Sequence, residues 1–86
     1  MAYSIIFTKE ATKDIKTLDS TVKRQLYKKF LYFQSLDDIK VVAKKLQNSK
    51  AGEYRLRVGS FRIIFDLDKH TIVVLRVQHR KDVYRS

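Results

Sequence analysis

The sequence contains no cysteine and no proline, and only two of its 86 residues are glycine. Without cysteine the chain can form neither a disulfide framework nor a thiolate metal site, which is compatible with a reducing cytoplasm. The apolar run Ile5-Ile6-Phe7 is short and is followed at once by Lys9 and Glu10, so we expect no signal peptide, no membrane span and a soluble cytoplasmic protein. No repeat or linker divides the chain. We therefore expect one domain, residues 1–86, with one modest core.

Acidic residues are scarce relative to basic ones. The chain carries 19 lysines and arginines but only 9 aspartates and glutamates, which gives a formal net charge of +10. This excess is uneven, because residues 1–43 hold 8 basic and 5 acidic side chains whereas residues 44–86 hold 11 and 4. Such a charge costs self-repulsion and favours polyanionic partners. We expect the partner surface on the C-terminal half and mostly solvated lysines on the helices of the N-terminal half.

The N-terminal half predicts a short strand followed by two helices. Tyr3, Ile5 and Phe7 alternate with their neighbours as in a strand, and Thr8 can cap the helix that follows. Asp19-Ser20 ends this helix and offers the next N-cap. The apolar stripes of the two predicted helices are Ala11, Ile15 and Leu18 in the first, and Val22, Leu26, Phe30 and Phe33 in the second. Both have helical spacing, which predicts an antiparallel helix pair over one face of a sheet.

The region after Ser35 is less regular. Helical spacing continues from Ile39 to Leu46 and predicts a short third helix, followed by a loop over residues 47–52. The lysines at the edges of this loop are Lys44, Lys45 and Lys50. They fit either ordinary solvent exposure or a basic rim that contacts an RNA backbone.

The stretch from Tyr54 to Leu67 predicts a β-hairpin. Apolar residues alternate with polar ones on both sides of Gly59-Ser60, a pair that suits a two-residue turn with positive φ at Gly59. This turn places Arg57 opposite Arg62, with Cβ atoms roughly 5 Å apart on the same face. Like charges in that arrangement weaken a sheet, so the pair indicates a bound anion, and phosphate matches the planar fork of arginine.

A third strand follows from Thr71 to Val77. A short turn at Asp68–Thr71 would place Arg62 opposite Val77, which puts His79 on the same face as the two arginines and Arg76 on the core side. Arg80, Lys81 and Tyr84 would then follow at the end of the strand. The predicted fold is α+β, with a short N-terminal strand and two to three helices packed on a mostly antiparallel sheet.

The segment YRLRVGSFRIIFDLDKHTIVVLRVQHRKDVY resembles the C-terminal half of the RelE/ParE superfamily of toxins from type II toxin–antitoxin systems. Its ending, HRKDVY, resembles the RelE branch, whose members are ribosome-dependent messenger-RNA endonucleases. The resemblance implies a metal-independent endoribonuclease with no cofactor. It also implies a cognate antitoxin as inhibitor, and messenger RNA in the ribosomal A site as substrate.

The resemblance also suggests which residues act in the site. Cleavage by attack of a ribose 2′-OH needs a general base, cations around the phosphorane and an acid for the leaving oxygen. The catalytic candidates are Arg57, Arg62, His79, Arg80 and Tyr84, and the RNA-binding candidates are Lys45, Lys50, Arg55 and Lys81. Either His79 or Tyr84 fits the role of general base. The scattered carboxylates favour no metal site.

Two other functions are compatible with the same composition. The ParE branch shares the fold but inhibits DNA gyrase, and it typically lacks the catalytic residues. A non-catalytic basic RNA-binding module is the other alternative. Neither binder needs a group that titrates near neutrality or a C-terminal tyrosine, so the catalytic set favours the RelE branch.

Overall fold

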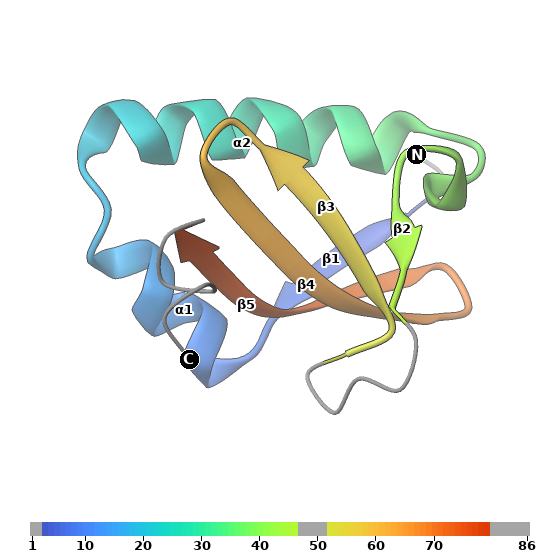
Figure 1. Cartoon of the computed structure of the whole chain (residues 1–86). Helices are drawn as coiled ribbons and strands as arrows, with labels where there is room; N and C mark the ends of the chain where they lie inside the picture. The colour runs from blue at the N-terminus through green and yellow to red at the C-terminus, as the bar shows by residue number, and fades with distance from the viewer. Residues whose placement is uncertain (1–2, 47–51, 80–86) are drawn as a thin grey trace.

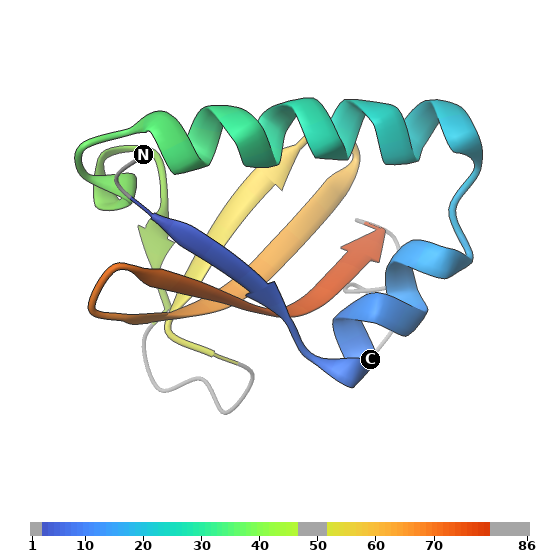
Figure 2. The same ribbon diagram turned by 180° about the vertical axis from the view of Figure 1, so that it is seen from behind.

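A computed structural model of the chain describes residues 3–46 and 52–79, and it shows two helices packed on a five-stranded mixed sheet (Figures 1 and 2). The elements are β1 (Ser4–Phe7), α1 (Lys9–Lys16), α2 (Ser20–Ser35), a 3₁₀ turn (Ile39–Val41), β2 (Lys44–Lys45), β3 (Tyr54–Val58), β4 (Phe61–Asp68) and β5 (Thr71–His79). The strand order is β1-β5-β4-β3-β2, in which β1 runs parallel to β5 and the other neighbours are antiparallel. The predicted α+β class is confirmed.

Both predicted helix caps are present. The Ala11 N–H donates to Thr8 Oγ1 at 3.2 Å, and the Val22 N–H donates to Asp19 Oδ1 at 2.9 Å. Each side chain thereby satisfies one of the backbone donors that a helix leaves unpaired in its first turn. The boundaries of the two helices therefore follow from the local sequence.

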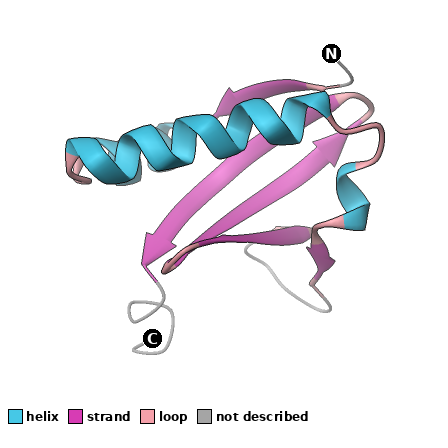
Figure 3. Ribbon diagram, turned by 90° about the horizontal axis from the view of Figure 1, so that it is seen from above, coloured by secondary structure: helices cyan, strands magenta, loops and turns pink. Residues whose placement is uncertain are grey.

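The two helices do not pack closely along their length. α1 lies against β5. α2 crosses over the strands, as the view from above shows (Figure 3). An open apolar groove remains where they diverge, and it is lined by Phe7, Ile15, Lys23, Leu26, Tyr27 and Phe30. The predicted antiparallel pair is thus correct in general direction but splayed. None of the described helices is long and apolar enough to cross a membrane.

The predicted third helix is wrong. Its first residues form a single 3₁₀ turn, and Lys44–Lys45 then pair with β3 as a two-residue edge strand. The buried Ile39 anchors the turn, because its N–H donates to the phenol oxygen of Tyr3 at 3.0 Å. Val42, which belongs to the same predicted apolar stripe, is exposed, so the stripe does not pack on the core as a continuous helix face.

The hairpin is as predicted. Gly59 has φ of +58°, and the register pairs Arg57 with Arg62 and Val58 with Phe61. One face of the sheet packs against the helices and carries the core residues Leu56, Val58, Ile63, Phe65, Ile72, Val74 and Val77. The face predicted to lie against the helices is therefore the one that is buried.

The register of β5 departs from the prediction. The turn places Leu67 opposite Ile72 as expected, but a β-bulge between Ile64 and Phe65 shifts the later pairs by one residue. Phe65 pairs with Val74 and Ile64 pairs with Arg76, so Leu75 is the extra residue. As a result, Gln78 and not Val77 lies opposite Arg62.

Candidate functional site

The face of the sheet away from the helices carries two rows of polar and basic side chains. One row crosses the sheet as Arg57, Arg62 and Gln78, and the second as Lys44, Arg55, Ile64 and Arg76. Alternation along each strand puts both rows on one face. We call this surface, with its cations Lys44, Arg55, Arg57, Arg62 and Arg76, the arginine face.

The two arginines of the first row differ in exposure. Arg57 is exposed, whereas Arg62 retains only 9% of its accessible surface. A small pocket lies beside them at the hairpin turn, lined by Arg57, Gly59, Ser60, Phe61 and Arg62. Arg57 thus presents its charge to solvent, and Arg62 lies at the base of the same surface. Two guanidinium groups at different depths can contact different oxygens of one phosphate.

The centre of the arginine face is apolar. Ile64 is buried although it lies outside the main core, because the backbone at Gly52 passes over Ile64 and Leu75. A Cβ at Gly52 would lie 2.7 Å from one methyl group of Ile64 and 2.8 Å from one of Leu75. Glycine is the residue that permits this approach. The cations are therefore arranged around a packed apolar centre.

Lys44, and not Lys45, belongs to the arginine face. The register pairs Lys44 with Arg55 and Lys45 with Tyr54, whose ring stacks on Phe65 on the helix-covered side. The predicted RNA-binding residue Lys45 is therefore one position away from the residue that the fold brings next to Arg55. A one-residue difference of this kind exchanges the two faces of a strand.

His79 lies on the opposite face from Arg62, so the predicted placement is wrong. It pairs with Phe61, and the two rings meet edge to face with centroids 5.1 Å apart. The cause is the bulge at Leu75, which reverses the facing expected from the turn. His79 therefore packs beside an aromatic ring instead of joining the arginine pair.

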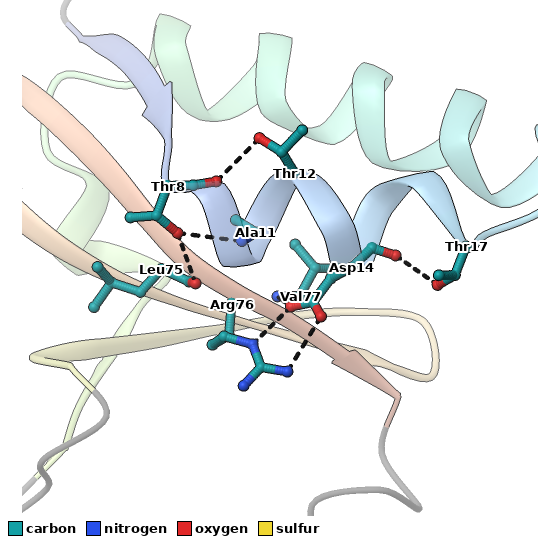
Figure 4. A network of polar contacts seen from close by, with 8 residues as sticks. All are labelled: Thr8, Ala11, Thr12, Asp14, Thr17, Leu75, Arg76 and Val77. Carbon is teal, nitrogen blue, oxygen red and sulfur yellow. Dashed lines mark hydrogen bonds and ion pairs between the residues drawn. The ribbon is translucent and has the colours of Figure 1, made fainter.

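Arg76 was predicted on the core side but lies on the arginine face, where Asp14 of α1 holds it (Figure 4). Its Nε donates to Asp14 Oδ2 at 2.8 Å and its Nη2 donates to Oδ1 at 3.1 Å. The same carboxylate accepts the Val77 N–H at 2.9 Å. The hydrogen bond with Asp14 raises the pKa of Arg76 further above its already high ordinary value.

α1 covers the part of β5 that β1 does not reach. The Thr8 N–H donates to the Val74 carbonyl at 3.0 Å. Thr8 Oγ1 donates to the Leu75 carbonyl at 3.0 Å, and Asp14 accepts from the Val77 N–H (Figure 4). These contacts satisfy backbone groups that an open strand edge would expose. Sequence reasoning missed the role of Asp14. The signal was its position inside the apolar stripe, three residues after the buried Ala11.

Four predicted site residues lie outside the described residues. They are Lys50, Arg80, Lys81 and Tyr84. Their roles stay predictions. Among residues 3–46 and 52–79, no group of three or more histidine and carboxylate side chains is arranged to hold a metal ion.

Comparison with known proteins identifies the family. The family model described as the ParE toxin of the parDE type II toxin–antitoxin system matches residues 5–84. The chain belongs to the RelE/ParE superfamily of toxins. Two curated relatives are toxins of the RelE kind. The toxin is 31% identical to Toxin RelE3 of Methanocaldococcus jannaschii, with 93% of each chain covered, and 31% identical to Toxin RelG of Mycobacterium tuberculosis, with 99% of each covered.

Solved structures agree with this assignment. The toxin resembles a chain of the RelBE2 toxin–antitoxin complex of Mycobacterium tuberculosis, with a TM-score of 0.76, 28% identity, and 93% and 100% of the two chains covered. It also resembles a chain of the intact RelBE complex of Escherichia coli, with a TM-score of 0.70, 27% identity, and coverage of 91% and 96%. The superfamily that the sequence suggested is therefore confirmed, and this protein is a RelE-family toxin of a type II toxin–antitoxin system.

Proposed function

We propose that this toxin is a ribosome-dependent, metal-independent messenger-RNA endonuclease. The observation that carries the proposal is the cross-strand pair Arg57 and Arg62, flanked on the same face by Arg55 and Lys44. A sheet gains no stability from facing like charges, whereas a phosphodiester between them can accept hydrogen bonds from both guanidinium groups. The relatives named RelE3 and RelG support the RelE branch.

The reaction needs charge stabilisation more than it needs a large site. The 2′-oxygen attacks the adjacent phosphorus, a bond to the 5′-oxygen breaks, and negative charge accumulates on the phosphorane oxygens between these events. Arg57 and Arg62 supply fixed positive charge at that point. The ribosome would hold the RNA strand in place, which suits a site formed by a few cations on one small sheet.

Two protons must also move, one from the 2′-OH and one to the 5′-oxygen. We assign the base to Tyr84, because the resemblance carries a C-terminal tyrosine and His79 packs against Phe61 on the other face. The ordinary pKa of a tyrosine is about 10, so this role needs neighbouring guanidinium groups that favour the phenolate. Arg80, which the resemblance also assigns to the site, is the candidate for the second proton transfer.

The test is Arg57→Ala. Arg57 is exposed and faces another cation, so its removal should leave the thermal midpoint unchanged or slightly higher. Cleavage of translated messenger RNA should fall on the order of 10²-fold or more, as it does when one donor to a transition-state oxyanion is lost. Arg24→Ala is the matched control, since Arg24 is exposed on α2, away from the arginine face.

Cut sites should be mapped with the parent and both variants, with and without ribosomes. The proposal requires cuts that depend on ribosomes and that disappear in Arg57→Ala but persist in Arg24→Ala. Parental cutting by a folded Arg57→Ala variant would refute the clamp. Absence of any cutting by the parent on translating ribosomes would refute the endonuclease.

Inhibition of DNA gyrase is the second candidate, because the matching family model is described by the ParE toxin. A supercoiling assay with purified gyrase separates the two functions. We expect the parent toxin to leave supercoiling unchanged at concentrations that abolish translation.

A further inference from the structure

Arg76 lies beside the arginine pair although it belongs to a different strand. It pairs with Ile64, two residues along β4 from Arg62, so Arg76 and Arg62 are diagonal neighbours on adjacent strands. The Cα atoms of such neighbours lie roughly 7–8 Å apart. That spacing suits two adjacent groups on an extended polyanion, and it extends the arginine face from β2 to β5.

Asp14 leaves part of the Arg76 guanidinium available. The carboxylate accepts from Nε and Nη2, which uses one edge of a group that carries five N–H donors. The Arg76 side chain is 44% exposed, whereas Asp14 is 18% exposed. The carboxylate is thus largely covered and holds the guanidinium in one orientation, while the other guanidinium edge faces outward.

Attachment of α1 to the sheet does not by itself account for this arrangement. The Val77 N–H already binds Asp14, and Thr8 joins the helix to two further backbone groups of β5. An ion pair with one half-exposed partner contributes little stability beyond these contacts. Its larger effect is to fix a long side chain that would otherwise rotate freely in solvent.

We propose that Arg76, oriented by Asp14, is an RNA-binding residue that contacts a phosphate adjacent to the one held by Arg57 and Arg62. The proposal rests on the proposed function for its ligand class, a single RNA strand. Asp14 is a positioning residue in this view. The residue pair would widen the RNA-binding surface from the hairpin to the edge of β5.

The experiment measures binding of a short single-stranded RNA with 2′-O-methyl riboses, which 2′-OH attack cannot cleave. Each phosphate contact adds about 0.7 to the slope of log affinity against log salt concentration for single strands. Arg76→Gln should therefore make this slope less steep, with a magnitude smaller by about 0.7. Arg76→Lys keeps the charge and should keep the slope while binding more weakly, because lysine cannot form the bidentate contact with Asp14.

Arg24→Gln is the matched control, since it removes the same charge from α2 and should leave the slope unchanged. Equal slopes for Arg76→Gln and Arg24→Gln, with both proteins folded, would overturn the proposal. A variant-free measurement covers the case in which Arg76→Gln unfolds. In the parent, the Arg76 Nε–H resonance should shift when the RNA is added, and an unmoved resonance at saturation would also overturn it.

These measurements do not depend on cleavage. If the parent binds the RNA with an Arg76-dependent slope but cuts nothing on ribosomes, the proposed endonuclease fails and the RNA contact stands. If the parent cuts on ribosomes and Arg76→Gln keeps the parental slope, the contact fails and the endonuclease stands.

Discussion

At the scale of single residues, the position of His79 predicts a role in packing and not in catalysis. Its ring meets Phe61 edge to face on the helix-covered side. His79→Ala should therefore lower the free energy of unfolding by about 1 kcal/mol, the usual worth of an aromatic pair, and keep most of the cleavage rate. Urea unfolding and single-turnover cleavage of the same preparations measure the two effects.

His79→Phe is the matched control, because it keeps an aromatic ring against Phe61 and removes the titratable group. It should restore stability and cut at the parental rate. Tyr84→Phe should lose most of its activity at every pH if Tyr84 is the base. Abolished cutting by a stable His79→Phe variant would return the base to His79.

The face of the sheet on which a residue lies could be predicted only where a local turn fixes the register. Arg57 and Arg62 were placed correctly because a two-residue turn fixes its own register. Lys44 was left out of the RNA-binding candidates and Arg76 was placed on the core side, since the facing of each depends on a strand boundary or a bulge that no local pattern signals. Asp14 was overlooked because its partners, Arg76 and Val77, lie more than sixty positions away along the chain.

At the scale of secondary-structure elements, the Thr8 side chain forms two hydrogen bonds with the backbone, whereas the Asp19 side chain forms one. Thr8 Oγ1 caps α1 and also donates to the Leu75 carbonyl, whereas Asp19 only caps α2. Thr8→Val keeps the shape of the side chain and loses both hydrogen bonds. We expect it to cost about 2 kcal/mol, compared with about 1 kcal/mol for Asp19→Ala.

Urea unfolding of both variants checks this prediction, provided that the free energy of unfolding falls with urea concentration at the same slope in each. Equal losses would show that the bond from Thr8 to β5 contributes nothing, and α1 would then be held to the sheet by Asp14 and by apolar contacts alone.

The elements that the sequence predicted well are those with local signals. The caps at Thr8 and Asp19 and the turn at Gly59 each act within four residues, and each is present. The segment from Ile39 to Leu46 was misread because its helical spacing is equally compatible with one 3₁₀ turn and a short strand. Contacts with Tyr3 and with β3 favour the turn and the strand over a helix, and both partners lie outside this segment of the sequence.

At the scale of the whole molecule, the net charge of +10 defines the kind of antitoxin that fits. Two of the structures that resemble this toxin are RelBE toxin–antitoxin complexes. We expect the cognate antitoxin to place acidic side chains over or beside the arginine face, where complementary charge speeds association. The association rate should fall steeply with salt, and the complex should no longer bind the 2′-O-methyl RNA.

Binding of that RNA to the free toxin and to the purified complex tests the expectation. An RNA affinity that is the same in both states would show that inhibition acts without covering or distorting the arginine face. Arg57→Ala is the control. The RNA affinity of this free variant shows how much binding is lost when one cation of the arginine face is removed, and the affinity of the complex is compared with it.

The bulge at Leu75 also affects how this chain is aligned with its relatives. β5 contains one residue more than the stretch of β4 with which it pairs, so Leu75 has no partner residue in β4. A relative that lacks this residue would still present the equivalents of Arg76 and Gln78 to the arginine face. An alignment gap placed at any other position of β5 would exchange inward and outward residues and would assign the site to the wrong side chains.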